Sequence, residues 1–191
     1  VAAKQLILST GFLAVIIMVI ALIGCTFILQ LVFPNVESSV MWNAQTYFRI
    51  SAWSYPFIAL YNSGAALFRS MGNSRISMIT SLFMNAFNIA GNAVLIYGFH
   101  MGVAGAAISS LVSRILGSLF MLYLLRSPDN TIYIDDYRRL EFHPAMIRRI
   151  LTIGIPNGLE NGMFQIGKIL VQGLIAGFGT VAIAANAVAN N

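Results

Sequence analysis

Long apolar runs separated by short charged stretches are the main pattern of this 191-residue chain. Residues 6–33, for example, contain no charged side chain. Each run is close to or longer than the roughly 20 residues that an α-helix needs to cross the hydrocarbon core of a bilayer. The pattern therefore predicts five membrane-spanning helices, at 6–33, between Arg49 and Arg69, between Arg75 and His100, at 101–125, and within 152–179.

Two prolines modify this helical pattern. Pro56 lies inside the second apolar run, where a proline is expected to kink the helix. Pro144 is expected to start a short amphipathic helix that leads into the fifth span. The apolar side of this helix would carry Met146, Ile147, Ile150 and Leu151, and its water-facing side Arg148 and Arg149.

The composition supports an all-α polytopic membrane protein. Hydrophobic residues make up 58% of the chain and charged residues only 9%, whereas soluble domains average about 25% charged residues. The alternating segments of roughly ten residues that mark a membrane β-barrel are missing from the sequence. Cys25 has no second cysteine to pair with, and it is expected to act as a small buried hydrophobic residue.

Enzymatic and nucleic-acid-binding functions find no support in the sequence. It contains no HExxH, GxSxG, Walker or cysteine-cluster motif, so neither an enzyme active site nor a metal or organic cofactor is expected. The net charge of +5 does not indicate nucleic acid as a partner, because most basic residues flank apolar runs. The expected surroundings are a lipid bilayer and small organic molecules.

The distribution of basic residues predicts an orientation, because cytoplasmic loops are enriched in Lys and Arg. With five alternating spans, the outer side would hold Arg49 alone, and the loop around His100 has no Lys or Arg. The cytoplasmic side would hold eight basic residues: Lys4, Arg69, Arg75, Arg126, Arg138, Arg139, Arg148 and Arg149. The longest loop, at 127–143, is then cytoplasmic, and a loop of this length often joins two helical bundles.

A polar stripe marks the third span. Ser77, Ser81, Asn85, Asn88 and Asn92 are spaced 4, 4, 3 and 4 residues apart, which confines them to an arc of roughly 80° on one helix face. Two interpretations remain open. The side chains either form hydrogen bonds between helices or line a water-filled cavity that binds a cation.

The fourth span combines small residues with one charge. Gly105, Ser109, Ser113 and Gly117 recur every fourth residue, a pattern typical of close contact between membrane helices. Arg114 follows Ser110 by one turn, about eleven residues or ~16 Å from the cytoplasmic end, too far for complete snorkelling to the interface. Arg114 has either a structural role inside the bundle or a role in transport.

The fifth span carries Glu160 and Lys168, which are about 80° apart around a helix and ~12 Å apart along it. They are therefore not expected to pair with each other. The surrounding Gly154, Pro156 and Gly158 make this helix easy to bend. A bendable helix with ionisable groups is typical of alternating-access transporters, although a purely structural network also remains possible.

Three segments carry a resemblance to a known family: "YFRISAWSYPFIALYNSGAALFRSMGNSR", "NAFNIAGNAVLIYGFHMGVAGAAISSLVSR" and "IGIPNGLENGMFQIGKILVQGLIAGFGTVAIAANAVAN". Together they resemble the multidrug and toxic compound extrusion (MATE) family. The resemblance implies a twelve-helix protein with two six-helix lobes. Residues 1–126 would supply helices three to six of the first lobe, 127–149 the cytoplasmic linker between the lobes, and 150–191 the first helix of the second lobe.

The resemblance also implies site residues. The family's first-lobe site for a cation or proton uses an Asn and an Asp one turn apart on the fifth helix and a hydroxyl on the sixth. The matching positions are Asn88, Asn92 and Ser110. Asn92 stands where proton-coupled members carry aspartate, and an amide does not take up a proton near neutral pH. Many members place an acid on the seventh helix about one turn after Glu160, at Phe164.

The function implied is secondary active export of organic, often cationic, compounds across the cell membrane in exchange for Na⁺ or H⁺. The candidate residues of the cation or substrate pathway are Glu160, Lys168, Asn85, Asn88, Asn92, Ser110 and Arg114. Alternatives are a flippase for lipid-linked precursors of the same superfamily and a membrane sensor or scaffold that transports nothing. Because the chain begins at Val1 and ends on "AIAANAVANN", we expect it to be an internal part of a longer protein.

Overall fold

The computed structural model describes residues 2–32, 38–127 and 143–176. Within these ranges every regular element is a helix, which confirms the predicted all-α class. The helices are α1 (Ala2–Val32), α2 (Ser38–Ala52), α3 (Tyr55–Ser70), α4 (Ser74–Ala93), the π-helical segment η1 (Val94–Gly98), α5 (Gly102–Leu124) and α6 (Pro144–Ala176).

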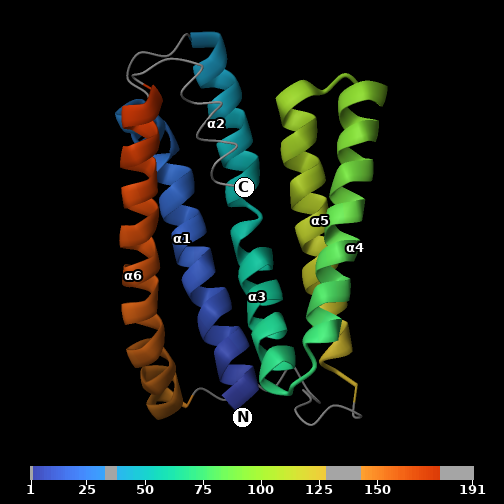
Figure 1. The fold of residues 1–191 in the computed structure, drawn as a ribbon, viewed down its shortest axis with the longest axis vertical. Coiled ribbons are helices and arrows are strands. Elements are labelled where there is room, and N and C mark those ends of the chain that lie inside the picture. The colour runs from blue at the N-terminus through green and yellow to red at the C-terminus, as the bar shows by residue number, and fades with distance from the viewer. Residues whose placement is uncertain (1, 33–37, 128–142, 177–191) are drawn as a thin grey trace. The chain divides into compact units, whose positions relative to one another are not determined.

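The chain divides into two compact units, residues 1–142 and 143–191. In the first unit, α1 packs antiparallel to α2 and α3, and α4 packs antiparallel to α5 (Figure 1). Helix α5 also contacts α2 and α3, so it joins the two helical hairpins of this unit. The predicted assignment of 127–149 to a linker between lobes stays a prediction, since 128–142 lie outside the described residues.

Three described segments are long and apolar enough to cross a membrane: Ala2–Gln30, Ser74–Gly98 and Gly102–Leu124. They correspond to the first, third and fourth predicted spans. The chain is therefore a multi-pass membrane protein, consistent with the large apolar side chains that these helices expose.

The predicted start of the second span at Arg49 is wrong. Helix α2 begins at Ser38 and carries Arg49 in its last turn, so this arginine lies within a helix and not in an outer loop. The helix is then interrupted at residues 53–54, before α3 begins at Tyr55. Pro56 has no backbone N–H for the helical ladder, and the break confirms that the helix is disturbed at this proline.

At the break, Ser54 replaces the missing helical bonds locally. Its backbone N–H and its side-chain hydroxyl both donate to the Ser51 carbonyl, at 2.9 and 2.6 Å. Ser54 is fully buried. The result is a broken helix whose interruption lies inside the first unit.

Close contacts between helices depend on residues with little or no side chain. Gly105, Ser109, Ser113 and Gly117 are all buried, and this confirms the predicted close packing of the fourth span. A Cβ added at Gly117 would overlap the Met84 side chain on α4. An apolar core cluster contains Ala65, Leu67, Phe68, Met121 and Leu125.

Helix α4 ends in the π-helical segment, which the sequence pattern did not predict. The Phe99 N–H donates to the Val94 carbonyl at 3.1 Å, a bond that spans five residues. His100 and Gly102 then adopt positive φ angles of 54°, a conformation that is strained for a histidine. These residues make the tight turn that brings α5 back along α4.

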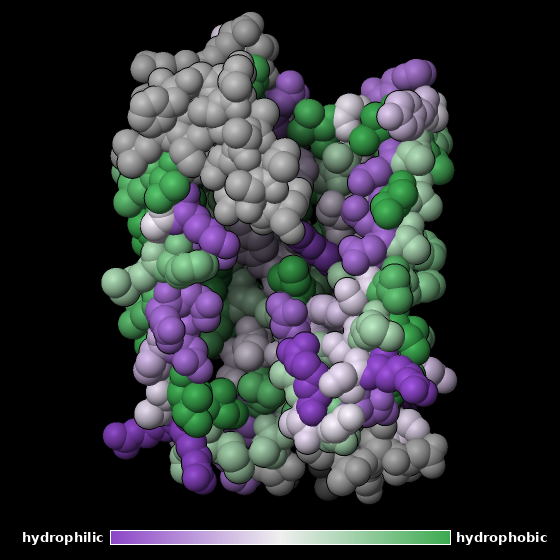
Figure 2. Space-filling model, in the orientation of Figure 1, coloured by the Kyte–Doolittle hydropathy of each residue, from purple (hydrophilic) through white to green (hydrophobic). Residues whose placement is uncertain are grey.

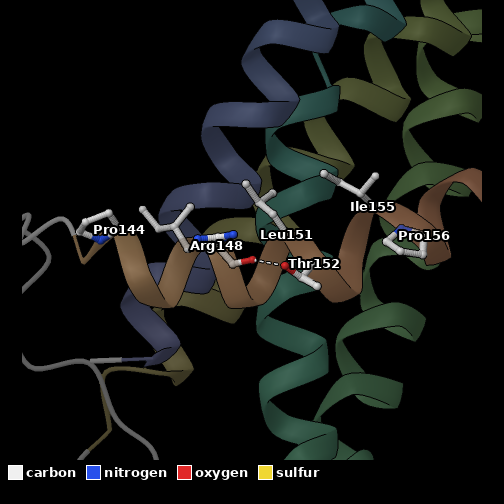
Figure 3. A pocket seen from close by; sticks show the side chains of 7 residues that line it. Pro144, Arg148, Leu151, Thr152, Ile155 and Pro156 are labelled. Atoms are coloured by element: carbon white, nitrogen blue, oxygen red, sulfur yellow. Dashed lines mark hydrogen bonds between the residues drawn. The ribbon is translucent and has the colours of Figure 1, made fainter.

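The second unit contains α6. This helix begins at Pro144 as predicted, but it continues to Ala176 without forming a separate short amphipathic helix. Arg148 and Arg149 are exposed, as predicted. Figure 3 shows a groove along one face of α6, where the Thr152 hydroxyl donates to the Arg148 carbonyl at 2.8 Å.

Candidate functional site

Three predicted site residues meet between α4 and α5. The Asn88 side-chain amide donates to the Ser110 hydroxyl oxygen at 3.1 Å, and this bond joins the two helices. One turn along α4, the Asn92 amide donates to the Asn88 side-chain oxygen at 3.2 Å. The three side chains therefore form one hydrogen-bonded chain, which we call the α4–α5 polar site.

The backbone behind this site is fixed by a second set of bonds. The Ser109 hydroxyl donates to the Asn88 carbonyl at 2.9 Å, and the Ser113 hydroxyl donates to the Ser109 carbonyl at 2.7 Å. Gly91 lies opposite Ser109, and a Cβ built on it would lie 2.5 Å from the Ser109 hydroxyl oxygen. Only a glycine at 91 permits this approach, so close packing sets the position of Asn88 relative to Ser110.

One end of the α4–α5 polar site lacks a partner. The Asn92 side-chain oxygen is buried and accepts no hydrogen bond from the described residues. A buried polar group without a partner costs about 1–3 kcal/mol, and most such groups in native proteins have one. This oxygen can therefore accept a hydrogen bond from a water or substrate, or coordinate a cation such as Na⁺.

The other residues of the polar stripe differ in how deeply they are buried along α4. Ser77 is buried, and its carbonyl accepts a bond from the Tyr61 hydroxyl at 3.4 Å, whereas Asn85 is exposed. Figure 2 shows hydrophilic side chains over α4 on the side toward α3, with hydrophobic side chains along the opposite edge. The stripe thus combines contacts between helices with exposed polar positions, and the water-filled cavity stays a prediction.

An apolar groove of about 290 Å³ lies on the seam between α4 and α5. Ser109 and Ser113 line it together with Phe87, Val94 and Val112. Ser109 also donates to the Asn88 carbonyl, so the groove lies beside the contacts that hold the backbone of the polar site. The sequence pattern did not predict the groove, because it depends on the exact positions of the two helices.

Arg114 donates from its guanidinium group to the Ser54 hydroxyl at the break between α2 and α3. It lies 12 residues after Gly102 and 10 before Leu124, about 18 Å and 15 Å from the two ends of α5. Arg114 is partly buried. An arginine at the centre of a membrane helix costs about 2.5–3.5 kcal/mol even on insertion scales, so this side chain needs polar surroundings.

The contact between Arg114 and Ser54 was missed by sequence reasoning. Arg114 was singled out by its place in an apolar run, but no spacing rule pairs it with a serine 60 positions earlier. The available signal was local: Ser54 lies two residues before Pro56 and three after Ser51, where a broken helix frees backbone groups.

Glu160 and Lys168 lie in the second unit on α6, and both are exposed. Among the described residues no ion pair joins the two side chains. The Lys168 ammonium lies 4.9 Å from the centre of the Phe164 ring, one turn earlier on the same helix. Such a cation–π contact contributes about 0.5–1 kcal/mol at an exposed site.

The fold and the buried polar contacts define a multi-pass helical membrane protein with a polar site inside the bundle, and comparison with known proteins identifies its class. The family model MatE matches residues 1–94. The multidrug export protein MepA of Staphylococcus saprophyticus is 31% identical over 139 residues, covering 72% of this chain and 30% of that protein.

Two more similarities extend further along the chain. The probable multidrug resistance protein NorM of Thermotoga maritima is 26% identical over 208 residues, covering all of this chain and 42% of that protein. A MATE family transporter solved in an inward-facing conformation matches with a TM-score of 0.70 and 26% identity, over 81% of this chain and 34% of that one.

The chain belongs to the MATE family of transporters. It spans about a third of the length of the curated relatives that it matches.

Proposed function

We propose that the full-length protein is a secondary active exporter, which moves organic compounds out across the cell membrane in exchange for an inward flow of Na⁺ or H⁺. The observation that carries this proposal is the α4–α5 polar site, with its buried and unpaired Asn92 oxygen. The multidrug export named for the MepA relative supports the same reaction class.

The chemistry of the polar site limits the role that it can play in coupling. Its side chains are two amides and a hydroxyl, which can provide oxygen ligands to Na⁺ or hydrogen bonds to a substrate. None of them takes up a proton near neutral pH. If the coupling ion is a proton, a carboxylate elsewhere must carry it, and Glu160 is the only carboxylate among the described residues.

The proposal places the protein in the cell membrane with the loop at 127–143 in the cytoplasm. The Lys and Arg bias supports this orientation, because basic residues favour the cytoplasmic side. With Arg49 now within α2, no basic residue is left on the proposed outer side, and the bias is stronger than the sequence pattern suggested. The partners are the bilayer and small organic substrates, with no enzymatic step.

The test is transport by the full-length protein in sealed proteoliposomes loaded with a fluorescent dye. An imposed Na⁺ or pH gradient should drive dye movement against its own gradient, and an ionophore that collapses the driving gradient should stop it. Dye movement that is unaffected by either gradient, or movement of a labelled lipid-linked precursor alone, would contradict ion-driven export. Complete absence of transport for every compound would favour a sensor or scaffold.

A further inference from the structure

The groove along one face of α6 has a volume of about 570 Å³, and its lining residues are three or four positions apart in sequence. Such spacing places side chains next to one another on one face of a helix. Pro144 lies at one end of the groove and Pro156 at the other (Figure 3). The groove therefore extends over about 18 Å of α6, at 1.5 Å per residue.

The groove is apolar except for one charged side chain. The aliphatic residues Ile147, Leu151 and Ile155 line it between the two prolines. The Thr152 hydroxyl donates its proton to the Arg148 carbonyl at 2.8 Å, so this donor is used within the helix. Of the described residues that line the groove, Arg148 alone is charged.

The charged and the aliphatic side chains lie at different levels along α6. Arg148 is four residues after the start of the helix at Pro144, and Ile155 is seven residues further on, about 10 Å along the axis. The sequence predicts that the fifth membrane span begins near residue 152. The groove thus crosses the predicted boundary between the headgroups, where Arg148 lies, and the hydrocarbon, where Ile155 lies.

A phospholipid with an anionic headgroup complements both parts of the groove. Two phosphate oxygens can accept parallel N–H bonds from one guanidinium group, and an acyl chain can cover the aliphatic side chains. The proposed orientation places the start of α6 on the cytoplasmic side, where the leaflet is rich in anionic lipids that attract Lys and Arg. A protein helix in the groove would cover its aliphatic side chains but would not by itself provide a phosphate for Arg148.

We propose that the groove on α6 binds one anionic phospholipid of the cytoplasmic leaflet, with the phosphate on Arg148 and an acyl chain along Leu151 and Ile155. The bound lipid would hold the start of α6 at the membrane surface. This lipid site goes beyond the proposed export function, from which it takes only the orientation of the chain.

The test uses the full-length protein in nanodiscs, with a nitrobenzoxadiazole fluorophore on Leu159→Cys, one turn after Ile155, and all other cysteines replaced by serine. Phosphatidylglycerol and phosphatidylcholine, each with a doxyl spin label on the same acyl-chain carbon, quench the fluorophore when they bind beside it. The ratio of their quenching gives their relative affinity. Phosphatidylglycerol should be preferred by about fivefold, and Arg148→Gln should reduce this preference to about one.

Matched variants separate the lipid site from general charge and from folding. Arg149→Gln makes the same change at the next residue, which is exposed but does not line the groove, and it should keep the preference. Arg148→Lys keeps the charge and should retain more of the preference than Arg148→Gln. Ile155→Ser should weaken quenching by both lipids, whereas Ile153→Ser, an exposed position on the opposite side of α6, should not.

Three results would overturn the proposal. Quenching by neither lipid would show that protein covers the groove. Equal loss of the preference in Arg148→Gln and Arg149→Gln would show a diffuse attraction to the surface and not a site. No preference in the wild type would refute the lipid site alone if ion-driven export is observed. A preference that depends on Arg148 would support the site even if the protein exports no dye, in which case the export function alone would fail.

Discussion

The most direct test of the packing between α4 and α5 is the substitution Gly91→Ala. The added Cβ would lie 2.5 Å from the Ser109 hydroxyl oxygen and 3.3 Å from the Ser109 Cβ. Ser109 can relieve the closer contact by rotating its side chain, but rotation breaks its bond to the Asn88 carbonyl. A hydrogen bond between membrane helices contributes about 0.6–1.7 kcal/mol, and overpacking costs about 1–3 kcal/mol.

We therefore expect Gly91→Ala to lower the free energy of unfolding by about 1–3 kcal/mol. The matched control is Gly98→Ala, seven residues later at the end of η1, where an added Cβ meets nothing within 4 Å. It should leave stability unchanged or raise it by up to about 1 kcal/mol, the gain from replacing a helical glycine.

The assay is reversible unfolding of the full-length protein in mixed micelles with increasing sodium dodecyl sulfate, monitored by tryptophan fluorescence. Transport should fall with Gly91→Ala, because the methyl group displaces the segment that holds Asn88. If Gly91→Ala is as stable as Gly98→Ala and transports at the parental rate, the close approach of α4 to α5 described above is wrong.

Two other predictions concern orientation and α6. Cysteines introduced at positions 71 and 135 should be protected from an impermeant maleimide in intact cells, whereas cysteines at 37 and 100 should be labelled; labelling at 135 but not at 100 would reverse the proposed orientation. Glu160→Gln in the full-length protein keeps the side-chain volume but removes the charge, so it should abolish export or uncouple it from the ion gradient at near-normal expression. Parental export with the same ion dependence would show that Glu160 is not part of the mechanism.

The sequence predicted helices wherever long apolar runs determine them. The spans predicted at 6–33, between Arg75 and His100, and at 101–125 match α1, α4 with η1, and α5 to within a few residues. In these segments, burial of apolar side chains in lipid and internal backbone hydrogen bonding favour the same structure. Local pattern and tertiary structure therefore agree.

The second span could not be predicted in the same way. A charged residue usually flanks a span, so the pattern predicts Arg49 as its boundary, yet α2 runs from Ser38 through Arg49. Helix α2 packs against both α1 and α5, and these tertiary contacts allow a helix in a segment with mixed polarity. A local hydrophobicity pattern does not predict such contacts between distant segments.

The candidate site was predictable only in part. The spacing of Asn88 and Asn92 predicts that they share one helix face, and in the structure Asn88 donates to Ser110 while Asn92 donates to Asn88. The sequence does not show which atom of this hydrogen-bonded chain lacks a partner. That depends on the rotation and separation of α4 and α5, which the close approach of Gly91 to Ser109 determines. The contact of Arg114 with Ser54 likewise depends on how α5 packs against the broken helix.

The measurement that tests the central claim most directly is the initial rate of ion-driven dye transport by full-length Asn92→Ala in proteoliposomes. This substitution removes the buried oxygen that lacks a partner, together with the bond to Asn88. Asn43→Ala, at an exposed position on α2, serves as the matched control. At cation concentrations below saturation, Asn92→Ala should transport dye at least about tenfold more slowly than the parent, as expected for loss of a ligand interaction of about 1.4 kcal/mol. The amount of folded Asn92→Ala protein should be normal, and Asn43→Ala should keep the parental rate. A parental rate and unchanged cation dependence for Asn92→Ala would contradict a functional role for the α4–α5 polar site.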